Sequence, residues 1–364
     1  MSSKQFYIAF AISIITMKMQ RLPCLVSGEL GKDGWLLFLF FTLINIIGIM
    51  LVFWIFRKID LQNVLNYSKN NFFNILRGFL LLATTLYFLV QASLVYEHIQ
   101  GLFAYTLFDN LSWPFFSLFL LFAVFLLAHR GIENIGLNFE IYFWIIAVSF
   151  LLISIFGANQ CNFSVVLPFE TINFKSIFPA IRTFSCWFGD FFLVLYLGIK
   201  AKDIKLSKTL LTYIVSMLFM TFLYIEFVGI YDKYAAIELG LISVLSEQSL
   251  LDLSIGRVDW FLILFTEIGA ILSCSISLYF ANLCLHSALS KARSIFLKIF
   301  NALVLYVLDI FILIDINAKI EFFCNIMCDI DFAIQIISLV ILFGLMLKKC
   351  TQRQPTLNKS EARL

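Results

Sequence analysis

The chain has 364 residues, of which 62% are apolar and only 13% are charged, and its formal net charge is +3. The charged share is about half of the roughly 25% found in a typical soluble domain. Composition therefore excludes a soluble enzyme, a disulfide-rich secreted scaffold and a disordered chain. The small net charge and the lack of basic runs interleaved with aromatic residues give no reason to expect a nucleic-acid partner. The composition predicts an all-α polytopic membrane protein.

Ten apolar stretches have roughly the length that a helix needs to cross a bilayer. We predict transmembrane helices at about 5–23, 35–56, 75–96, 112–128, 140–156, 179–198, 209–230, 258–285, 296–315 and 332–347. They form a single domain, 1–348, in which two five-helix halves cover about 1–157 and 179–348. A polar tail, 349–364, follows.

The orientation follows from the positive-inside rule. If the N-terminus is cytoplasmic, most of the 26 Lys and Arg residues fall in cytoplasmic segments. An even number of spans then places the C-terminal tail on the same side, so both termini are predicted to be cytoplasmic. No removable signal peptide is expected, because the N-terminus lacks a small-residue cleavage site after its apolar stretch.

Ionisable side chains near the middle of a bilayer are costly and usually face the protein interior. Five stand out in the predicted spans: Lys18, Asp190, Glu226, Glu267 and Asp309. One cation among four anions indicates pairing, and Asp190 or Glu267 is the preferred partner of Lys18. Two interpretations stay open: a structural salt bridge that locks helices together, or the lining of a polar cavity with a role in coupling.

Two predicted spans are interrupted by polar or small residues. The first ends in the run 16–23, which contains Lys18, Gln20, Arg21 and Pro23. Either the helix breaks there toward a cavity, or it is a short span that ends near Met17 at the interface. The sixth carries the run 185–190, which ends in Gly and Asp. Interruptions at corresponding places in two halves favour a mid-membrane site in an inverted-repeat transporter fold.

Further polar residues occur at helical spacing. Tyr87 and Gln91 in the third span, and Ser275 and Tyr279 in the eighth, are each four residues apart and share a face. Small polar residues in membrane helices also permit close packing. The sequence lacks the nucleotide-binding, hydrolase and metalloprotease motifs, so we expect no enzyme activity, cofactor or metal. The eight Cys are expected to be small buried apolar residues, since even the closest pair, Cys324 and Cys328, has no ligand-spaced partners.

Several short segments occur in a particular order and spacing along the chain. They are Lys4-Gln5-Phe6, Leu22-Pro23, Gly31-Lys32-Asp33-Gly34-Trp35-Leu36, Arg130-Gly131-Ile132-Glu133-Asn134-Ile135-Gly136, Leu167-Pro168, Phe188-Gly189-Asp190 and the stretch from Gly256-Arg257-Val258-Asp259 to Leu278-Tyr279. Together they resemble the spore germination permeases, the B-subunits of nutrient germinant receptors, within the amino acid/polyamine/organocation transporter superfamily. The resemblance covers nearly the whole chain and is carried by order, spacing and length rather than by one motif.

The resemblance implies ten transmembrane helices in two inverted five-helix repeats, with a site between broken first and sixth helices. It also implies a larger membrane A-subunit and a lipoprotein C-subunit as partners in the spore inner membrane. One departure stands out: Thr16 and Lys18 occupy the positions of a Gly-x-Gly that is common in the first span of the family. By resemblance and position, the ligand-binding residues are predicted to be Thr16, Lys18, Tyr87, Gln91, Trp187, Ser275 and Tyr279.

Three functions remain open at this point. The first is a membrane subunit of a germinant receptor that binds a small, amino-acid-like nutrient and signals through its partners. The second is a proton-coupled transporter of amino acids or organic cations, with Glu267 or Asp190 as the coupling group. The third is a structural subunit whose pocket is closed by the Lys18 side chain.

Overall fold

The structure is a computed structural model. It describes residues 1–19, 22–58, 71–106, 113–166, 174–232, 235, 259–289, 294–312, 328–338 and 340. Within these ranges the chain is helical and contains no strand. Half of the tenth predicted span and the whole polar tail lie outside the described residues.

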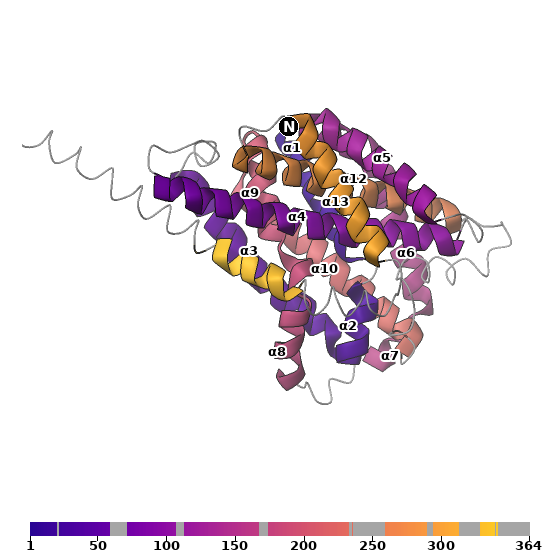
Figure 1. The fold of residues 1–364 in the computed structure, drawn as a ribbon. Coiled ribbons are helices and arrows are strands. Elements are labelled where there is room, and N and C mark those ends of the chain that lie inside the picture. The colour runs from indigo at the N-terminus through magenta and orange to yellow at the C-terminus, as the bar shows by residue number, and fades with distance from the viewer. Residues whose placement is uncertain are drawn as a thin grey trace, which may run out of the picture.

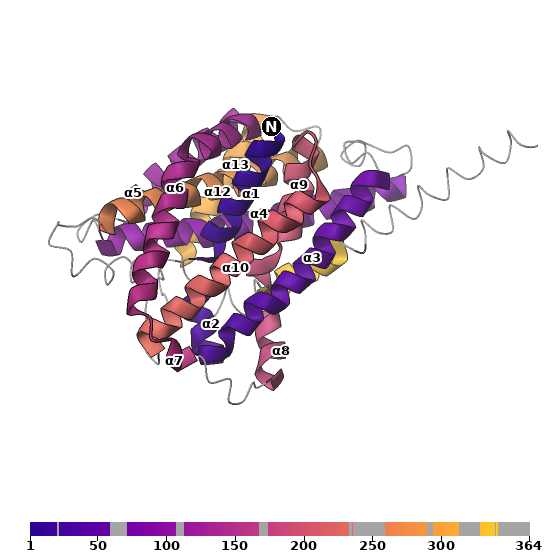
Figure 2. The same cartoon turned by 180° about the vertical axis from the view of Figure 1, so that it is seen from behind.

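Figures 1 and 2 show the arrangement of the helices. In chain order they are α1 (Ser3–Lys18), α2 (Leu22–Leu30), the 3₁₀ turn η1 (Gly31–Gly34), α3 (Trp35–Lys58), α4 (Asn71–Thr106), α5 (Trp113–Arg130), α6 (Ile132–Gln160), α7 (Phe163–Val166), α8 (Phe174–Thr183), the 3₁₀ turn η3 (Ser185–Phe188), α9 (Asp190–Lys200), α10 (Leu206–Tyr231), α12 (Asp259–Ala288) and α13 (Ser294–Ile312). Residues 328–338 form a further helix.

Five uninterrupted helical segments among the described residues are long and apolar enough to cross a membrane. They are Leu22–Arg57, Arg77–Tyr96, Ile132–Asn159, Leu206–Tyr231 and Leu264–Ala288. A sixth crossing is made if the bent pair Ile177–Thr183 and Ser185–Lys200 counts as one broken span. Two shorter apolar helices, Ser117–Arg130 and Ser294–Leu308, match the fourth and ninth predicted spans. The helical membrane class is thus confirmed, while ten spans in inverted repeats stay a prediction.

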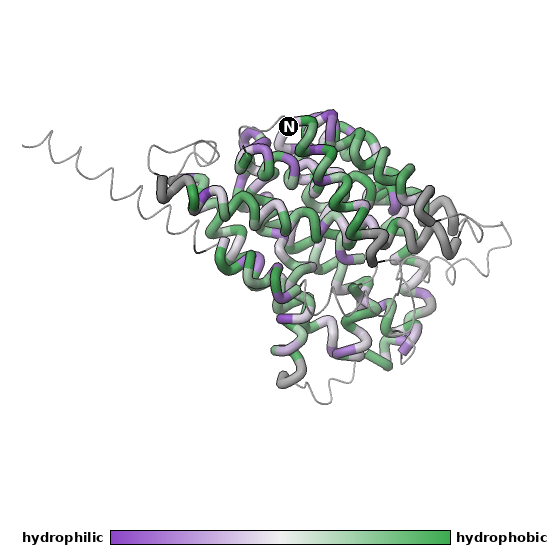
Figure 3. The backbone as a smooth tube through the Cα atoms, viewed as in Figure 1, coloured by the Kyte–Doolittle hydropathy of each residue, from purple (hydrophilic) through white to green (hydrophobic). Residues whose placement is uncertain are grey.

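Many large apolar side chains of the described helices are exposed, and hydrophobic residues predominate along the helices in Figure 3. Leu43 and Ile47 on α3, Phe119 on α5 and Trp144 on α6 are all more than half exposed. In water such a surface would be unfavourable, but lipid chains solvate it at no cost. The exposed side chains therefore mark the membrane-facing side of the protein, and the chain is an integral membrane protein.

Helix α1 lies in the interior of the bundle, where it packs against α10, α12, α6 and α9 (Figure 2). Its start is well defined, because Ser2 and Gln5 form a reciprocal capping box. Helix α12 packs along α4 and α6 (Figure 1). The first span is thereby surrounded by later helices, which explains how a lysine near its end can be buried.

Both predicted interruptions are present. Helix α1 ends at Lys18, and α2 begins at Leu22 with Pro23 in its first turn, where the missing N–H of proline is tolerated. In the sixth span, α8 ends at Thr183 and the chain continues through η3 and Gly189 into α9. The helices on either side of this second break are bent by 75°.

Candidate functional site

The two breaks meet in a buried ion pair. Lys18, the last residue of α1, places its Nζ 2.6 Å from Oδ1 of Asp190, the first residue of α9. The Lys18 side chain is fully buried and that of Asp190 is 5% exposed. Two charges at this depth are stable only when they are paired and hydrogen-bonded. Of the two partners predicted for Lys18, the structure therefore selects Asp190 over Glu267.

Aromatic side chains complete the environment of the pair. The hydroxyl of Tyr213, on α10, donates to Oδ2 of Asp190 at 3.2 Å. The Lys18 ammonium lies 5.3 Å from the ring centroid of Phe188, a distance at which the ring face attracts a cation. Phe188 in turn stacks on Phe41 of α3 with centroids 3.9 Å apart. The ion pair is thus enclosed by α1, α3, α9 and α10.

Side chains from α3 and α4 donate hydrogen bonds to backbone carbonyl groups at the break in the sixth span. Asn45 donates from Nδ2 to the carbonyl of Phe188 at 2.7 Å, and the hydroxyl of Tyr87 donates to the carbonyl of Gly189 at 2.8 Å. Gln91 donates to the carbonyl of Cys186. Because unpaired peptide groups are costly inside a membrane, these three donors stabilise the irregular backbone beside Asp190.

The turn η3 is also linked to the helix of residues 328–338, by a disulfide and by hydrogen bonds. Cys186 and Cys328 form a disulfide with Cα atoms 4.8 Å apart. Next to it, Ser185 Oγ donates to the carbonyl of Cys328 at 3.2 Å, and Gln335 Nε2 donates to the carbonyl of Ser185 at 3.1 Å. The prediction that the cysteines are merely small apolar residues was wrong for this pair. Sequence spacing did not reveal it, because the two positions are 142 residues apart.

A separate set of hydroxyl groups joins α1 to α12. Thr16 Oγ1 lies 2.8 Å from Ser273 Oγ, which also donates to Ser13 Oγ at 3.2 Å. Ser275, by contrast, donates to the carbonyl of Ile271 in its own helix. Small side chains permit this close approach, since a Cβ at Gly269 would lie 3.0 Å from a methyl group of Thr16.

The seven residues predicted to bind a ligand do not all lie in one place. Lys18, Tyr87, Gln91 and Trp187 all belong to the surroundings of η3 and Asp190. Thr16 belongs to the α1–α12 contact. Ser275 is buried and bonded within its helix, and Tyr279 is partly buried against Phe280. Their predicted role in ligand binding stays a prediction.

The sequence singled out three further carboxylates in the spans: Glu226, Glu267 and Asp309. Glu226 on α10 is completely buried and accepts hydrogen bonds from Ser154 Oγ of α6 at 3.3 and 3.4 Å. Glu267 on α12 is 1% exposed. Asp309 lies in α13, but its side chain is outside the described residues. Glu226 thus occupies a position apart from the Lys18–Asp190 pair.

Sequence reasoning missed several polar partners of the site. Asn45 is a single amide in the long apolar run of α3, and Tyr213 is one of three tyrosines in α10. An isolated amide in the middle of an apolar span is a signal that could have been used, because it needs a polar partner there. The contact between Ser13 and Ser273 was not predicted, because small polar residues in membrane helices usually serve only to permit close packing.

The described residues offer little for metal binding. No group of three His, Cys, Asp or Glu side chains within them is arranged to hold a metal ion. Two surface cavities lie on other parts of the bundle: one between α3 and the start of α10, and one apolar groove between α5 and α13. Neither is lined by Lys18 or Asp190.

Gly189 leads to a first prediction, because it separates η3 from Asp190 and lies against Tyr87. A Cβ at this position would clash with the ring and hydroxyl of Tyr87. Gly189→Ala is therefore expected to lower the free energy of unfolding by about 1–3 kcal/mol, as measured by denaturant unfolding in detergent. Gly78→Ala is the control, because a Cβ there meets nothing within 4 Å. Equal stability of the two variants would contradict the close packing of Gly189 on Tyr87.

The long apolar helices make this chain an integral membrane protein, and the Lys18–Asp190 pair is enclosed where two of its helices are interrupted. Residues 1–319 match the family described as "Spore germination protein". The chain belongs to this spore germination permease family, which confirms the resemblance seen in the sequence. No curated protein matches the chain closely enough to serve as a relative.

Proposed function

We propose that this chain is the membrane subunit of a spore germinant receptor, and that it binds a small amino-acid-like nutrient at the breaks of the first and sixth spans. The observation that carries the proposal is the buried Lys18–Asp190 pair. Family membership supports a role in germination. The proposed location is the spore inner membrane, with both termini cytoplasmic.

The chemistry of the pair suits a zwitterion. An amino acid presents a carboxylate and an ammonium group, which match Lys18 and Asp190 respectively. The described structure has these two side chains satisfying each other at 2.6 Å. A ligand would replace this contact with two new charge pairs, which separates α1 from α9. Because a ligand shifts an equilibrium only through its differential affinity for the two states, the free protein would hold the contracted state and the nutrient would favour the separated one.

The signal would then pass to partners, for which we propose a larger membrane A-subunit and a lipoprotein C-subunit. Family membership alone supports this step. The chain itself is proposed to have no enzyme activity and to need no cofactor, because its polar groups suit binding and conformational change.

The test uses germination of spores that carry single variants at the native locus. Lys18→Gln and Asp190→Asn are each expected to reduce the rate of nutrient-triggered germination at least tenfold, while germination by a receptor-independent stimulus stays normal. Lys4→Gln is the matched control. Lys4 lies on the same helix as Lys18, but its ion pair with Glu140 of α6 is exposed. Immunoblotting confirms that each variant accumulates. A Lys18→Gln strain with the parental response to every tested nutrient would overturn the role of the pair.

Proton-coupled transport of amino acids or organic cations is the second candidate. It is favoured by Glu226, which is fully buried and whose carboxylate accepts hydrogen bonds from the Ser154 hydroxyl. A carboxyl group in such a place exchanges protons more readily than it exchanges larger cations. Uptake of labelled amino acid into liposomes that contain this chain alone, abolished by Glu226→Gln, would favour transport. Ligand-dependent thermal stabilisation without flux would favour sensing.

A further inference from the structure

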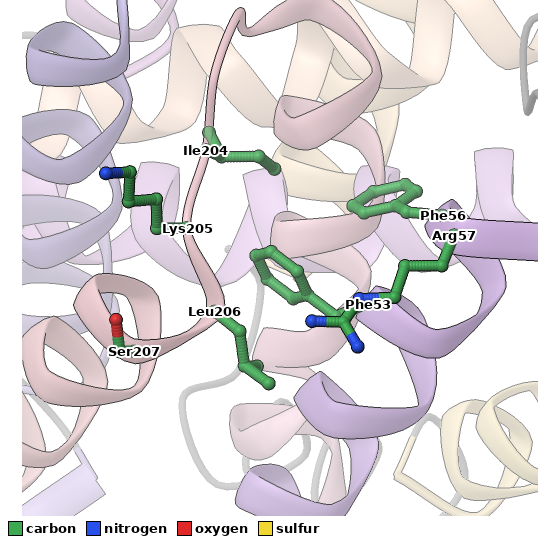
Figure 4. A pocket seen from close by; sticks show the side chains of 7 residues that line it. All are labelled: Phe53, Phe56, Arg57, Ile204, Lys205, Leu206 and Ser207. Atoms are coloured by element: carbon green, nitrogen blue, oxygen red, sulfur yellow. The ribbon is translucent and has the colours of Figure 1, made fainter.

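A second site is suggested by a cavity at the end of the bundle where α3 finishes and α10 begins. The cavity measures about 580 Å³ and opens to the surface. From α3 it is lined by Phe53, Phe56 and Arg57 (Figure 4). The segment that connects α9 to α10 contributes Ile204 and Lys205, and the start of α10 contributes Leu206 and Ser207. The cavity therefore lies where α3 ends and α10 begins.

The residues around the cavity place it on the cytoplasmic side. The apolar run of α3 stops at Arg57 and Lys58. The segment 200–208 between α9 and α10 contains four lysines and one acidic residue, Asp203. Such an excess of positive charge is typical of cytoplasmic connections. The cavity is thus at the depth of the phosphate groups of the cytoplasmic leaflet, which is rich in anionic lipids.

The lining has two chemical halves. Phe53, Phe56, Ile204 and Leu206 form apolar walls, as Figure 4 shows. The Arg57 side chain runs beside Phe53 with its guanidinium toward Leu206, whereas the Lys205 side chain points away from the cavity, on the other side of the connecting segment (Figure 4). Both cations are exposed. A soluble anion would use the charges alone, whereas a ligand with a phosphate and a hydrocarbon chain would use both halves.

We propose that this cavity binds an anionic phospholipid of the cytoplasmic leaflet, with its phosphodiester held by Arg57 and the upper part of an acyl chain against the aromatic walls. Guanidinium groups suit this ligand because they form paired hydrogen bonds with phosphate oxygens. The proposal is independent of the nutrient site, because it uses a different end of the bundle.

Such a lipid would bridge the two helices that complete the nutrient site. Helix α3 carries Asn45, which holds the carbonyl of Phe188, and α10 carries Tyr213, which donates to Asp190. A ligand between the ends of these helices stabilises their present spacing. The phospholipid composition of the leaflet would therefore bias the state of the protein, through packed elements that contact both sites.

The test measures lipid retention by the purified full-length chain in detergent, using native mass spectrometry. Wild-type protein is expected to retain phosphatidylglycerol or cardiolipin in preference to phosphatidylcholine of the same acyl chains. Arg57→Gln should weaken binding of the anionic lipid roughly fivefold, in line with the contribution of one basic residue near a lipid surface. Lys205→Gln should change the affinity less than about twofold, because the Lys205 side chain points away from the cavity. Arg57→Lys, which keeps the charge but loses the paired hydrogen bonds, should fall between wild type and Arg57→Gln.

Lys208→Gln is the matched control. Lys208 is exposed in the first turn of α10 but does not line the cavity, so this variant should change the affinity less than twofold. An equal loss for all three Gln variants would show a diffuse electrostatic attraction and overturn the proposal. Displacement of the bound lipid by millimolar inorganic phosphate would identify a soluble anion as the ligand and would also overturn it. Unchanged melting temperatures of the variants without added lipid show that the fold is intact.

Discussion

Lys18→Met is expected to lower the free energy of unfolding by about 3–5 kcal/mol, because it leaves the Asp190 carboxylate buried without its counter-charge. Lys18 is fully buried in the wild-type protein and its ammonium group contacts Asp190 directly at 2.6 Å. Burying a carboxylate that lacks a partner costs far more than losing one surface ion pair. Denaturant unfolding in detergent micelles, followed by tryptophan fluorescence, measures the change.

A double variant separates the charge effect from simple packing. Lys18→Met combined with Asp190→Leu removes both charges, so it should recover most of the lost stability. Lys4→Met is the control, since Lys4 is 71% exposed in its pair with Glu140 and its removal should have little effect. If the double variant is no more stable than Lys18→Met alone, the loss comes from packing, and the account of the pair given above is wrong.

Reduction of the Cys186–Cys328 disulfide is expected to destabilise the protein by roughly 2–5 kcal/mol, since the bond closes a long loop and restricts the unfolded chain. It joins η3 to the helix of residues 328–338 across 142 positions of sequence. Unfolding is measured with and without a reducing agent that reaches the site in detergent. Peptide mapping under non-reducing conditions identifies the cross-linked pair.

The cysteine substitutions provide the controls. The variant with Cys186→Ser and Cys328→Ser should match reduced wild-type protein and should no longer respond to the reducing agent. Cys284→Ala, at a buried position of α12 outside the disulfide, should keep the full response. Alkylation of all eight cysteines in unreduced, unfolded protein would contradict the disulfide.

Much of the local architecture was predictable because lipid imposes a simple rule on sequence. Every backbone polar group must be satisfied within the membrane, so long apolar runs become helices. The runs that became α3 and α10 were predicted within a few residues of their ends. Both interruptions were predicted as well, because polar and small residues together with Pro23 are out of place in an apolar helix.

The arrangement of the site was only half predictable. A lone lysine among apolar residues must find an anion, so pairing with Asp190 or Glu267 was a sound expectation. The choice of Asp190 depends on how α1 enters the bundle beside α9 and α10. The same packing brings Asn45 and Tyr87 to the carbonyl groups of the broken span. No spacing in the chain encodes these contacts, since each joins segments that are far apart.

From the chain alone, one could conclude that the protein resides in a membrane, that α3 and α10 begin and end near the predicted residues, and that the first and sixth spans are interrupted. These features are local, since they depend on the transfer of each segment between water and lipid. The ends of α4 and α6 could not be predicted in this way, because both helices extend well beyond the apolar runs 75–96 and 140–156. The packing of the helices selected Asp190 for Lys18, Cys328 for Cys186 and Ser273, rather than Ser275, for Thr16. Those pairings depend on the rotation and depth of each helix, which the neighbouring helices set through close packing that hydropathy does not describe.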